Sequence, residues 1–166
     1  MVTPGRVGET AFATPSDREI VITRVFDAPR ELVFAAWIDP QHIASWWGPT
    51  GFTTTIHEMD VRPGGVWRFI MHGPDGVDYP NKIEYLEIVK PERLFYNHGD
   101  DEAVRFQVTV TFEAQGEKTK LTMRSIFPTA AERDLVVTQY HAIEGGNQTL
   151  DRFGEHLKSA NLLRPS

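Results

Sequence analysis

Apolar and polar residues alternate through most of the middle of the chain. Between residues 104 and 112 an apolar side chain occupies every second position, with arginine, glutamine and threonine between them. Successive side chains of a β-strand point to opposite faces, so this pattern predicts strands with one apolar and one solvated face. Turn sequences such as Pro63-Gly64-Gly65 and Pro74-Asp75-Gly76 separate the strands and favour an antiparallel meander. Strands are expected over residues 19–26, 52–61, 66–72, 82–89, 93–98, 104–112 and 119–127.

A helical period replaces the alternation after the first strand. Apolar residues recur at helical spacing in residues 29–38, which predicts a short amphipathic helix with Asp27 as the capping carboxylate and Pro29 in its first turn. Asp39-Pro40 repeats this start signal and opens a second short helix toward Trp46. Two consecutive helices are therefore expected between the first and second strands.

A second helical region follows the last strand. Thr129 and Glu132 form a capping box, which predicts a short helical segment that is interrupted at Gly145-Gly146. A longer helix is expected from Asn147, with an apolar stripe made by Leu150, Phe153, Gly154 and Leu157. Because such a stripe must be buried, the apolar face of the sheet is its expected partner. The order of elements predicts an α+β fold.

Length and charge limit the class of protein. The 166 residues are sufficient for one domain, which we expect over residues 17–161, between a flexible tail at 1–16 and a short tail at 162–166. A net charge of −6 argues against nucleic-acid binding, which needs a concentrated basic surface. The chain has no cysteine and no apolar run long enough to span a membrane, and residues 1–16 are not expected to act as a secretory signal, because they contain no continuous apolar stretch. We therefore expect a soluble cytoplasmic protein.

Several short sequences, in this order, resemble a known family. The chain is similar to the helix-grip fold of the START and polyketide-cyclase superfamily (SRPBCC, birch-pollen-allergen-like), within the branch of the activator of heat-shock protein 90 ATPase. The segments that carry the resemblance are Ala28-Pro29 with Val33 and Trp37, Trp46-Trp47-Gly48-Pro49, Asp60 with Arg62, Gly64 and Gly65, Pro91-Glu92-Arg93-Leu94, and Gln148-Thr149-Leu150-Asp151-Arg152-Phe153.

The resemblance implies a curved seven-stranded antiparallel sheet wrapped round a long carboxy-terminal helix, with an apolar cavity between them. Members of the superfamily bind lipids, polyketides, hormones or aromatic compounds, and some catalyse cyclisation or dehydration. Two departures bear on function. Gly146-Asn147 replaces a common Gly-Trp pair, so Asn147 is expected to widen the cavity mouth. The eukaryotic activator also has an additional amino-terminal domain, for which the tail at 1–16 is too short.

Residues that would bind a ligand are aromatic, sulfur-containing or amide side chains expected on the inner faces. Aromatic and methionine side chains suit an adaptable apolar pocket. Of the tryptophan doublet, one ring is expected to pack inward and the other to line the opening, while Tyr85, Tyr140 and Asn147 are candidates for orienting a polar ligand atom. The alternative is a closed core without a cavity. The candidate ligand-binding residues are Trp47, Met59, Trp67, Phe69, Met71, Tyr85, Phe106, Met123, Asn147, Leu150 and Phe153.

Candidates for acid–base chemistry lie on the strand at 52–61. His57 shares a face with Met59 in a regular strand, and an internal imidazole could act as a general base. A register shifted by one residue would place Glu58 inside instead. The alternative is that both side chains are solvated. Asp60 and Arg62 are expected to shape the turn by hydrogen bonding rather than to take part in chemistry.

The sequence indicates no metal site and no cofactor. Its six histidines lack the close spacing of metal ligands, and there is neither a nucleophile elbow nor a phosphate-binding glycine loop. The leading hypothesis is a monomeric or homodimeric protein that binds a small apolar or aromatic molecule. One alternative is a cyclase or dehydratase that uses an internal histidine or glutamate. Another is a co-chaperone-like module, which would expose an apolar patch to a partner.

Overall fold

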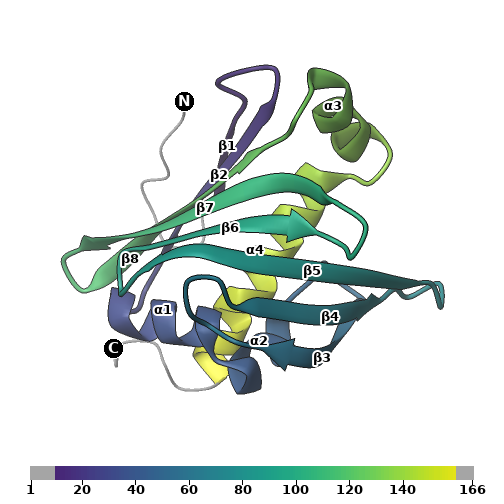
Figure 1. Ribbon diagram of the computed structural model, residues 1–166. Coiled ribbons are helices and arrows are strands. Elements are labelled where there is room, and N and C mark those ends of the chain that lie inside the picture. The colour runs from purple at the N-terminus through teal and green to yellow at the C-terminus, as the bar shows by residue number, and fades with distance from the viewer. Residues whose placement is uncertain (1–9, 160–166) are drawn as a thin grey trace.

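An antiparallel sheet organises the chain in the computed structural model, which describes residues 10–159 (Figure 1). Its strands are β1 (Thr10–Ala13), β2 (Glu19–Phe26), β3 (Thr53–Met59), β4 (Val66–His72), β5 (Asp78–Val89), β6 (Arg93–Gly99), β7 (Val104–Gln115) and β8 (Lys118–Ile126). The helices are α1 (Arg30–Ile38), α2 (Pro40–Trp46), α3 (Ala130–Thr138) and α4 (Ala142–Ser159). The predicted α+β helix-grip fold is confirmed, with eight strands among the described residues in place of the seven expected.

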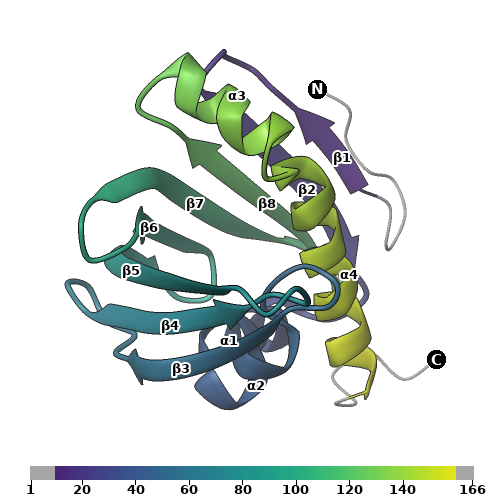
Figure 2. The same ribbon diagram turned by 90° about the vertical axis from the view of Figure 1, so that its right-hand side faces the viewer.

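The sheet is fully antiparallel and curves around the carboxy-terminal helix. The strand order is β1-β2-β8-β7-β6-β5-β4-β3, and all neighbouring strands run antiparallel. Figure 2 shows the sheet curving around α4, with α1 and α2 beside the end where α4 finishes. This curvature separates the inner face of the sheet from the first half of α4.

The predicted alternation of faces is observed in β4. Trp67 and Phe69 point to the inner face and are almost fully buried. Arg68 and His72 point outward, where they bind carboxylates of neighbouring strands. Local alternation was sufficient to predict this because a strand gives each side chain only two directions.

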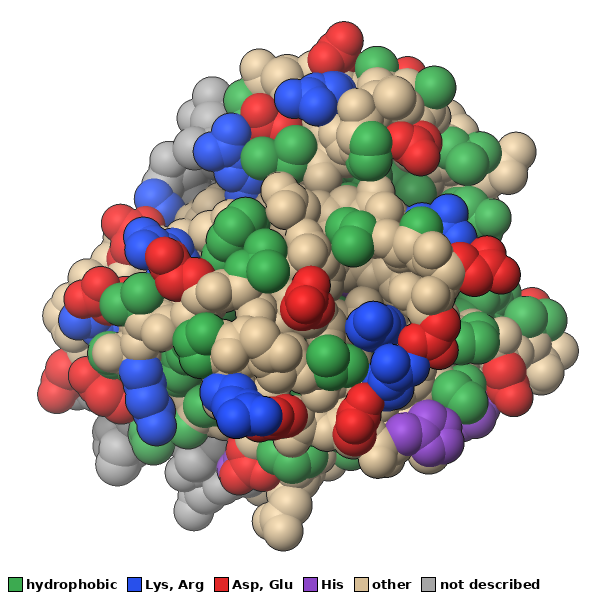
Figure 3. Space-filling view, viewed as in Figure 1, with side chains coloured by type: hydrophobic (Ala, Val, Ile, Leu, Met, Phe, Trp, Pro, Cys, Tyr) green, Lys and Arg blue, Asp and Glu red, His purple; other side chains and the backbone are tan. Residues whose placement is uncertain are grey.

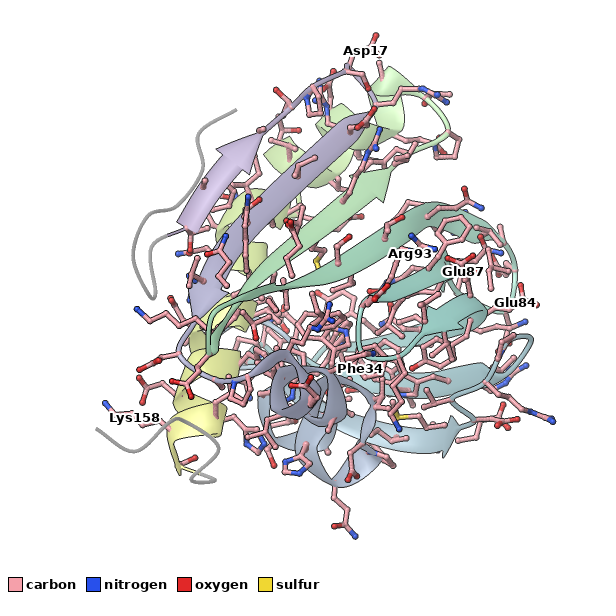
Figure 4. All side chains as sticks on the ribbon, turned by 90° about the vertical axis from the view of Figure 1, so that its left-hand side faces the viewer. Asp17, Phe34, Glu84, Glu87, Arg93 and Lys158 are labelled. Carbon is pink, nitrogen blue, oxygen red and sulfur yellow. The ribbon has the colours of Figure 1, made fainter. Side chains whose placement is uncertain are left out.

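Helices α1 and α2 close one end of the core with aromatic side chains. The ring of Phe34 on α1, labelled in Figure 4, lies 5.1 Å from the ring of Phe112 on β7, centroid to centroid. Trp46 is fully buried, and its indole N–H donates to the carbonyl oxygen of Ala36 at 3.2 Å. Trp46 is thus the inward member of the tryptophan doublet.

The two predicted helix starts differ in the structure. Asp39 caps α2, because its carboxylate accepts a hydrogen bond from the N–H of Gln41 at 2.9 Å. Asp27 does not cap α1, which corrects the prediction. Pro29 occupies the N-cap position of α1 and no side chain bonds there, so Asp27 lies two residues too early to reach the first-turn amides.

Helix α4 is continuous through Gly145 and Gly146, where the sequence predicted an interruption. A Cβ atom on Gly146 would lie 2.4 Å from the side chain of Ile22 on β2, and one on Gly145 would lie 3.3 Å from Pro49. Gly146 therefore allows the helix to approach the sheet closely, and Gly145 allows it to approach the loop at Pro49. Packing gained by this approach outweighs the low helix propensity of glycine, roughly 1 kcal/mol per residue.

The amino-terminal end of the described chain also differs from the prediction. Residues 10–13 were expected in a flexible tail, but they form β1 and pair with residues 21–24 of β2. Four residues are too few to show a strand pattern by themselves, and this strand is defined only by its pairing with β2. Residues 14–16 belong to the connection between β1 and β2, and the rest of the predicted tails, residues 1–9 and 162–166, lies outside the described residues.

The Pro-Gly-Gly turn has the geometry that its residues require. Arg62 donates to the carboxylate of Asp60 at 2.7 Å, as expected for residues that shape a turn. Gly64 has a φ of +84°, and a Cβ atom on Gly65 would lie 2.0 Å from the carbonyl oxygen of Asp60. The four helices are a separate matter: within residues 10–159, none is both long and apolar enough to cross a membrane.

Candidate functional site

A cavity of about 810 Å³ lies between the inner face of the sheet and the first half of α4. Strands β2 and β4 to β8 form one wall, and α4 forms the other. Tyr79 and Tyr140 line the cavity and are also exposed, so the cavity reaches the surface at these residues. The apolar part of its lining includes Ile20, Ile22, Trp47, Phe52, Met71, Phe106, Val108, Met123, Phe127 and Leu150.

The rim of the cavity is the loop that follows the tryptophan doublet. Arg152 of α4 donates through Nη1 to the carbonyl oxygens of Gly48, Pro49 and Phe52, each at 3.0 Å. Burial lowers the pKa of Arg152, whose charge is compensated here by carbonyl oxygens. The loop from Trp47 to Phe52 is therefore attached to α4, and we call it the rim loop.

A glycine and a glutamine complete the attachment of the rim loop. Gly48 has a φ of +104°, and a Cβ atom there would lie 3.0 Å from the side chain of Met71. Gln148 of α4 accepts a hydrogen bond from the N–H of Thr50 at 3.2 Å. Trp47, the first residue of the rim loop, is 7% exposed and lines the cavity, so it is the second ring of the doublet.

One part of the cavity wall is polar. His98 of β6 and Asn81 of β5 both line the cavity, and His98 Nε2 lies 2.9 Å from Asn81 Oδ1. Burial lowers the pKa of His98 to about 4, so its imidazole is neutral near pH 7. Tyr96, two residues before His98 on the same strand, lines the same wall, and burial raises the pKa of its phenol.

A smaller hollow of about 200 Å³ lies at the acidic connection between β6 and β7. Its carboxylates already have partners: Asp100 accepts from Arg105 at 3.1 Å, and Asp101 accepts from Arg68. The carboxylate of Asp100 also accepts N–H groups of its own loop. This cluster shapes the connection, so the larger cavity is the candidate site.

The sequence model of the family described as Activator of Hsp90 ATPase homolog 1-like protein matches residues 27–158. The chain belongs to this family. The predicted resemblance is thereby confirmed over most of the sequence. Among proteins with curated descriptions, none matches the chain significantly.

Solved structures show the same fold at low sequence identity. A protein from Arthrobacter aurescens is 23% identical, with a TM-score of 0.82 over 90% of this chain and 91% of that one. A protein from Mycobacterium smegmatis is 23% identical, with a TM-score of 0.81 over 92% and 99%. The AHSA1 protein from Silicibacter pomeroyi is 21% identical, with a TM-score of 0.71 over 86% and 99%. At these identities the likeness concerns the fold.

In this member of the Activator of Hsp90 ATPase homolog 1-like family, the predicted ligand-binding residues divide into two groups. The cavity is lined by Trp47, Met71, Phe106, Met123 and Leu150. It is not lined by Met59, Trp67, Phe69, Tyr85, Asn147 and Phe153. Tyr140, the further orienting candidate, does line it. The inner face of the sheet is thus partly cavity and partly closed core.

Close aromatic packing explains why several predicted residues form core. Trp67 and Phe69 stack with ring centroids 4.1 Å apart, and Phe153 lies 4.4 Å from Trp46. Tyr85 is buried in the same core, and burial raises the pKa of its phenol. These rings lie toward the α1 and α2 end, where the helices fill the space under the sheet.

Asn147 binds a buried arginine instead of facing the cavity. Its side-chain oxygen accepts from Nη2 of Arg24 on β2 at 2.5 Å. Asp151, one turn along α4, accepts from Nη1 of the same guanidinium at 2.7 Å. The expectation that Asn147 would widen the cavity mouth is therefore corrected: an arginine on the facing strand takes up its hydrogen-bonding capacity.

The two acid–base candidates lie on the outer surface. A β-bulge between Ile56 and Glu58 leaves His57 opposite no residue of β4, and His57 is exposed. Glu58 is also exposed and binds Arg68 at 2.7 Å. The alternative stated for them, that both side chains are solvated, is therefore the one observed, and the internal placement is wrong. The internal placement assumed a regular strand, and the bulge changes which residues share a face with Met59.

Three further histidines bond side chains that are distant in sequence or on neighbouring strands. On the outer face, His72 bonds Thr55 at 2.8 Å and Asp78 at 2.7 Å, the connectivity of a hydrolase triad, but this group lies away from the cavity. His42 of α2 and His156 of α4 have ring nitrogens 2.9 Å apart. Within residues 10–159, no cluster of three or more metal-binding side chains occurs.

The polar wall was missed by sequence reasoning. His98 was considered only as a metal ligand, and Asn81 and Tyr96 were not considered. The alternation of side chains along β6 would have indicated this, because Leu94, Tyr96 and His98 share one face and Phe95 and Asn97 share the other. An inward histidine on an apolar face could have been found from that alternation.

Proposed function

We propose that this protein binds a small, largely apolar molecule in the cavity between the sheet and α4. The cavity of about 810 Å³ carries the proposal, since ligand sites typically measure about 300–1,000 Å³. Its lining is mainly apolar and aromatic, and membership of the family is compatible with such binding. Each 100 Å² of apolar ligand surface removed from water would contribute roughly 2.5 kcal/mol before the costs of association.

A cavity-filling substitution tests the proposal. Ser125 lines the cavity from β8, whereas its neighbour Arg124 points to the opposite face and is exposed. We expect Ser125→Trp to weaken binding of Nile red, an uncharged fluorescent dye, at least tenfold, because the indole occupies the cavity. Arg124→Trp is the matched control and should bind the dye as the parent protein does. Equal dye binding by all three proteins, or none by the parent, would reject the cavity as the binding site.

A partner-binding module is the second candidate, because the family takes its description from an activator of the Hsp90 ATPase. Such a module would need an exposed apolar patch. The large exposed apolar side chains come from well-separated places, among them Phe12, Leu32, Leu86, Val104 and Leu135. Figure 3 shows hydrophobic side chains interspersed with charged ones on the outer face of the sheet. Ligand binding therefore has the stronger support.

The two candidates predict different results with a chaperone. A partner-binding module would change the rate of ATP hydrolysis by an Hsp90 from the same organism, and Ser125→Trp would leave that change intact. An unchanged rate, together with dye binding in the cavity, would favour ligand binding alone.

A cyclase or dehydratase is supported less well. His57 and Glu58, the candidates for its acid–base group, lie on the outer face. The cavity offers His98 instead, and an imidazole with a pKa of about 4 is a weak base near pH 7. We therefore keep binding as the proposed function.

A further inference from the structure

The polar wall of the cavity has a defined direction of hydrogen bonding. The side-chain N–H of Asn81 donates to the carbonyl oxygen of Tyr79 at 2.9 Å, which leaves Asn81 Oδ1 as the acceptor. His98 Nε2 lies 2.9 Å from that oxygen and must therefore carry the proton. In a neutral imidazole the other ring nitrogen, Nδ1, is then an acceptor.

Nδ1 of His98 has no donor among residues 10–159. The imidazole is surrounded by aromatic rings of three strands: its centroid lies 4.7 Å from Phe106, 6.1 Å from Phe69 and 6.5 Å from Tyr96. Apolar surroundings of this kind hold the ring neutral. Nδ1 is not among the buried atoms that lack a partner in residues 10–159, so it is accessible, and His98 lines the cavity, where a donor from a ligand would bond it.

Charge is absent from the rest of the cavity lining. Of the described residues that line it, none is lysine, arginine, aspartate or glutamate. The second lining histidine, His141, lies at the joint between α3 and α4. An ionised ligand group that entered the cavity would lose its hydration and gain no opposite charge in return, which is strongly unfavourable.

From these contacts we infer that the ligand is an uncharged, mainly apolar molecule with a hydroxyl or N–H group that donates to Nδ1 of His98. This inference rests on the proposed function, because it requires a ligand in the cavity. Asn81 acts as a positioning residue, since it determines which ring nitrogen of His98 carries the proton. Tyr96, two residues earlier on the same strand, also lines the cavity.

Three probes that share one ring system separate the contributions of apolar surface, a hydrogen-bond donor and a charge to binding. Naphthalene is uncharged and lacks a donor, 2-naphthol adds a hydroxyl, and 2-naphthoate adds a charge. One net hydrogen bond corresponds to roughly three- to tenfold in affinity, so 2-naphthol should bind tighter than naphthalene by that factor. The carboxylate should bind at least tenfold more weakly than naphthalene. Binding is measured by displacement of Nile red at pH 7.5.

Substitution of the acceptor should abolish the preference for the hydroxyl. His98→Phe retains an aromatic ring and removes Nδ1, so 2-naphthol and naphthalene should bind it equally. His57→Phe, on the outer face, is the matched control and should retain the preference. Long-range ¹H–¹⁵N spectra of the parent protein provide a reading that does not depend on how the variants fold. They should show His98 protonated at Nε2, with Nδ1 shifted by 2-naphthol and unaffected by naphthalene.

The outcomes distinguish the two levels of the proposal. If naphthalene and Nile red both fail to bind, the proposed cavity function is rejected. If naphthalene binds but 2-naphthol gains nothing, or if His98→Phe retains the preference, the inference about the donor is overturned and the cavity function stands. Tightest binding by 2-naphthoate would overturn the inference that the ligand is uncharged. A His98 protonated at Nδ1 would overturn the assigned direction of hydrogen bonding.

Discussion

His98 and His57 show how surroundings decide the role of the same side chain. His57 lies in a bulge at the surface, where water solvates its ring. His98 lies among aromatic rings and bonds Asn81, and burial lowers its pKa to about 4. Only the second imidazole is removed from bulk water and directed to the cavity. Its neutral form is therefore favoured in the folded protein.

The lowered pKa of His98 predicts a pH-dependent cost to stability. Above pH 6.5 His98 is neutral in both the folded and unfolded states. Between pH 6.5 and 4 only the unfolded state takes up this proton, so the folded state loses stability as the pH falls. A pKa of 6.5 in the unfolded state and about 4 in the folded state correspond to a total loss of roughly 3 kcal/mol.

His98→Gln removes this titration and is measured by urea unfolding at several pH values. The stability of the variant relative to the parent should rise by roughly 3 kcal/mol from pH 7 to pH 4. His57→Gln controls for a general effect of losing a histidine and should show a constant difference. A constant difference for His98→Gln as well would mean that the imidazole is solvated in the folded state.

At the scale of a single element, helix α4 determines the shape of the site, because it contacts both the sheet and the rim loop. Gly146 allows it to approach β2, and Arg152 attaches the rim loop to it. Its apolar residues Leu150, Phe153 and Leu157 are buried, so the predicted stripe is confirmed in all but its glycine, which is only partly buried. The position of the rim is therefore coupled to the packing of the helix.

Loss of the Arg152 side-chain charge should loosen the rim loop. Arg152→Met retains the aliphatic stem but leaves carbonyl oxygens of residues 48, 49 and 52 without their donor. We expect a loss of roughly 2 kcal/mol or more in unfolding free energy and faster amide exchange in residues 47–52. Lys158→Met, on the exposed end of the same helix, should change stability by less than about 0.5 kcal/mol. Unchanged exchange in the loop would show that its own turn geometry maintains it.

At the scale of the whole molecule, Arg24 connects parts of the chain that are far apart in sequence. It is 3% exposed and donates to Thr10 at 2.6 Å, Asp151 at 2.7 Å and Asn147 at 2.5 Å. One guanidinium thus links β1, β2 and α4. Breaking such a buried group is more damaging than breaking a surface pair, because its partners lose their hydrogen bonds inside the protein.

Arg24→Met is expected to lower the unfolding free energy by roughly 3 kcal/mol. The control is Arg93→Met, which removes a surface pair with Glu87 whose side chains are about half exposed and stand on the sheet in Figure 4. That change should amount to less than about 1 kcal/mol. Urea unfolding followed by circular dichroism measures both. Similar losses in the two variants would mean that the buried network adds no more than a surface pair.

Local patterns were sufficient wherever a residue's role depends on its near neighbours. Alternation predicted the inward Trp67 and Phe69, and the start signal at Asp39 predicted the cap of α2. One inward ring and one ring at the cavity were expected for the tryptophan doublet, and the structure assigns these places to Trp46 and Trp47. The segments that resemble the family were also sufficient to predict the helix-grip fold.

What the sequence by itself determined is thus the order of elements, the faces of regular strands and the family. Only the tertiary structure decided that β1 pairs with β2, that a bulge places Met59 on the face opposite to His57, and that Asn147 binds Arg24. It also decided which inner residues line a cavity and which fill the core. The physical reason is that these outcomes depend on partners from distant strands and on the volume left between a curved sheet and a helix, which no local pattern specifies.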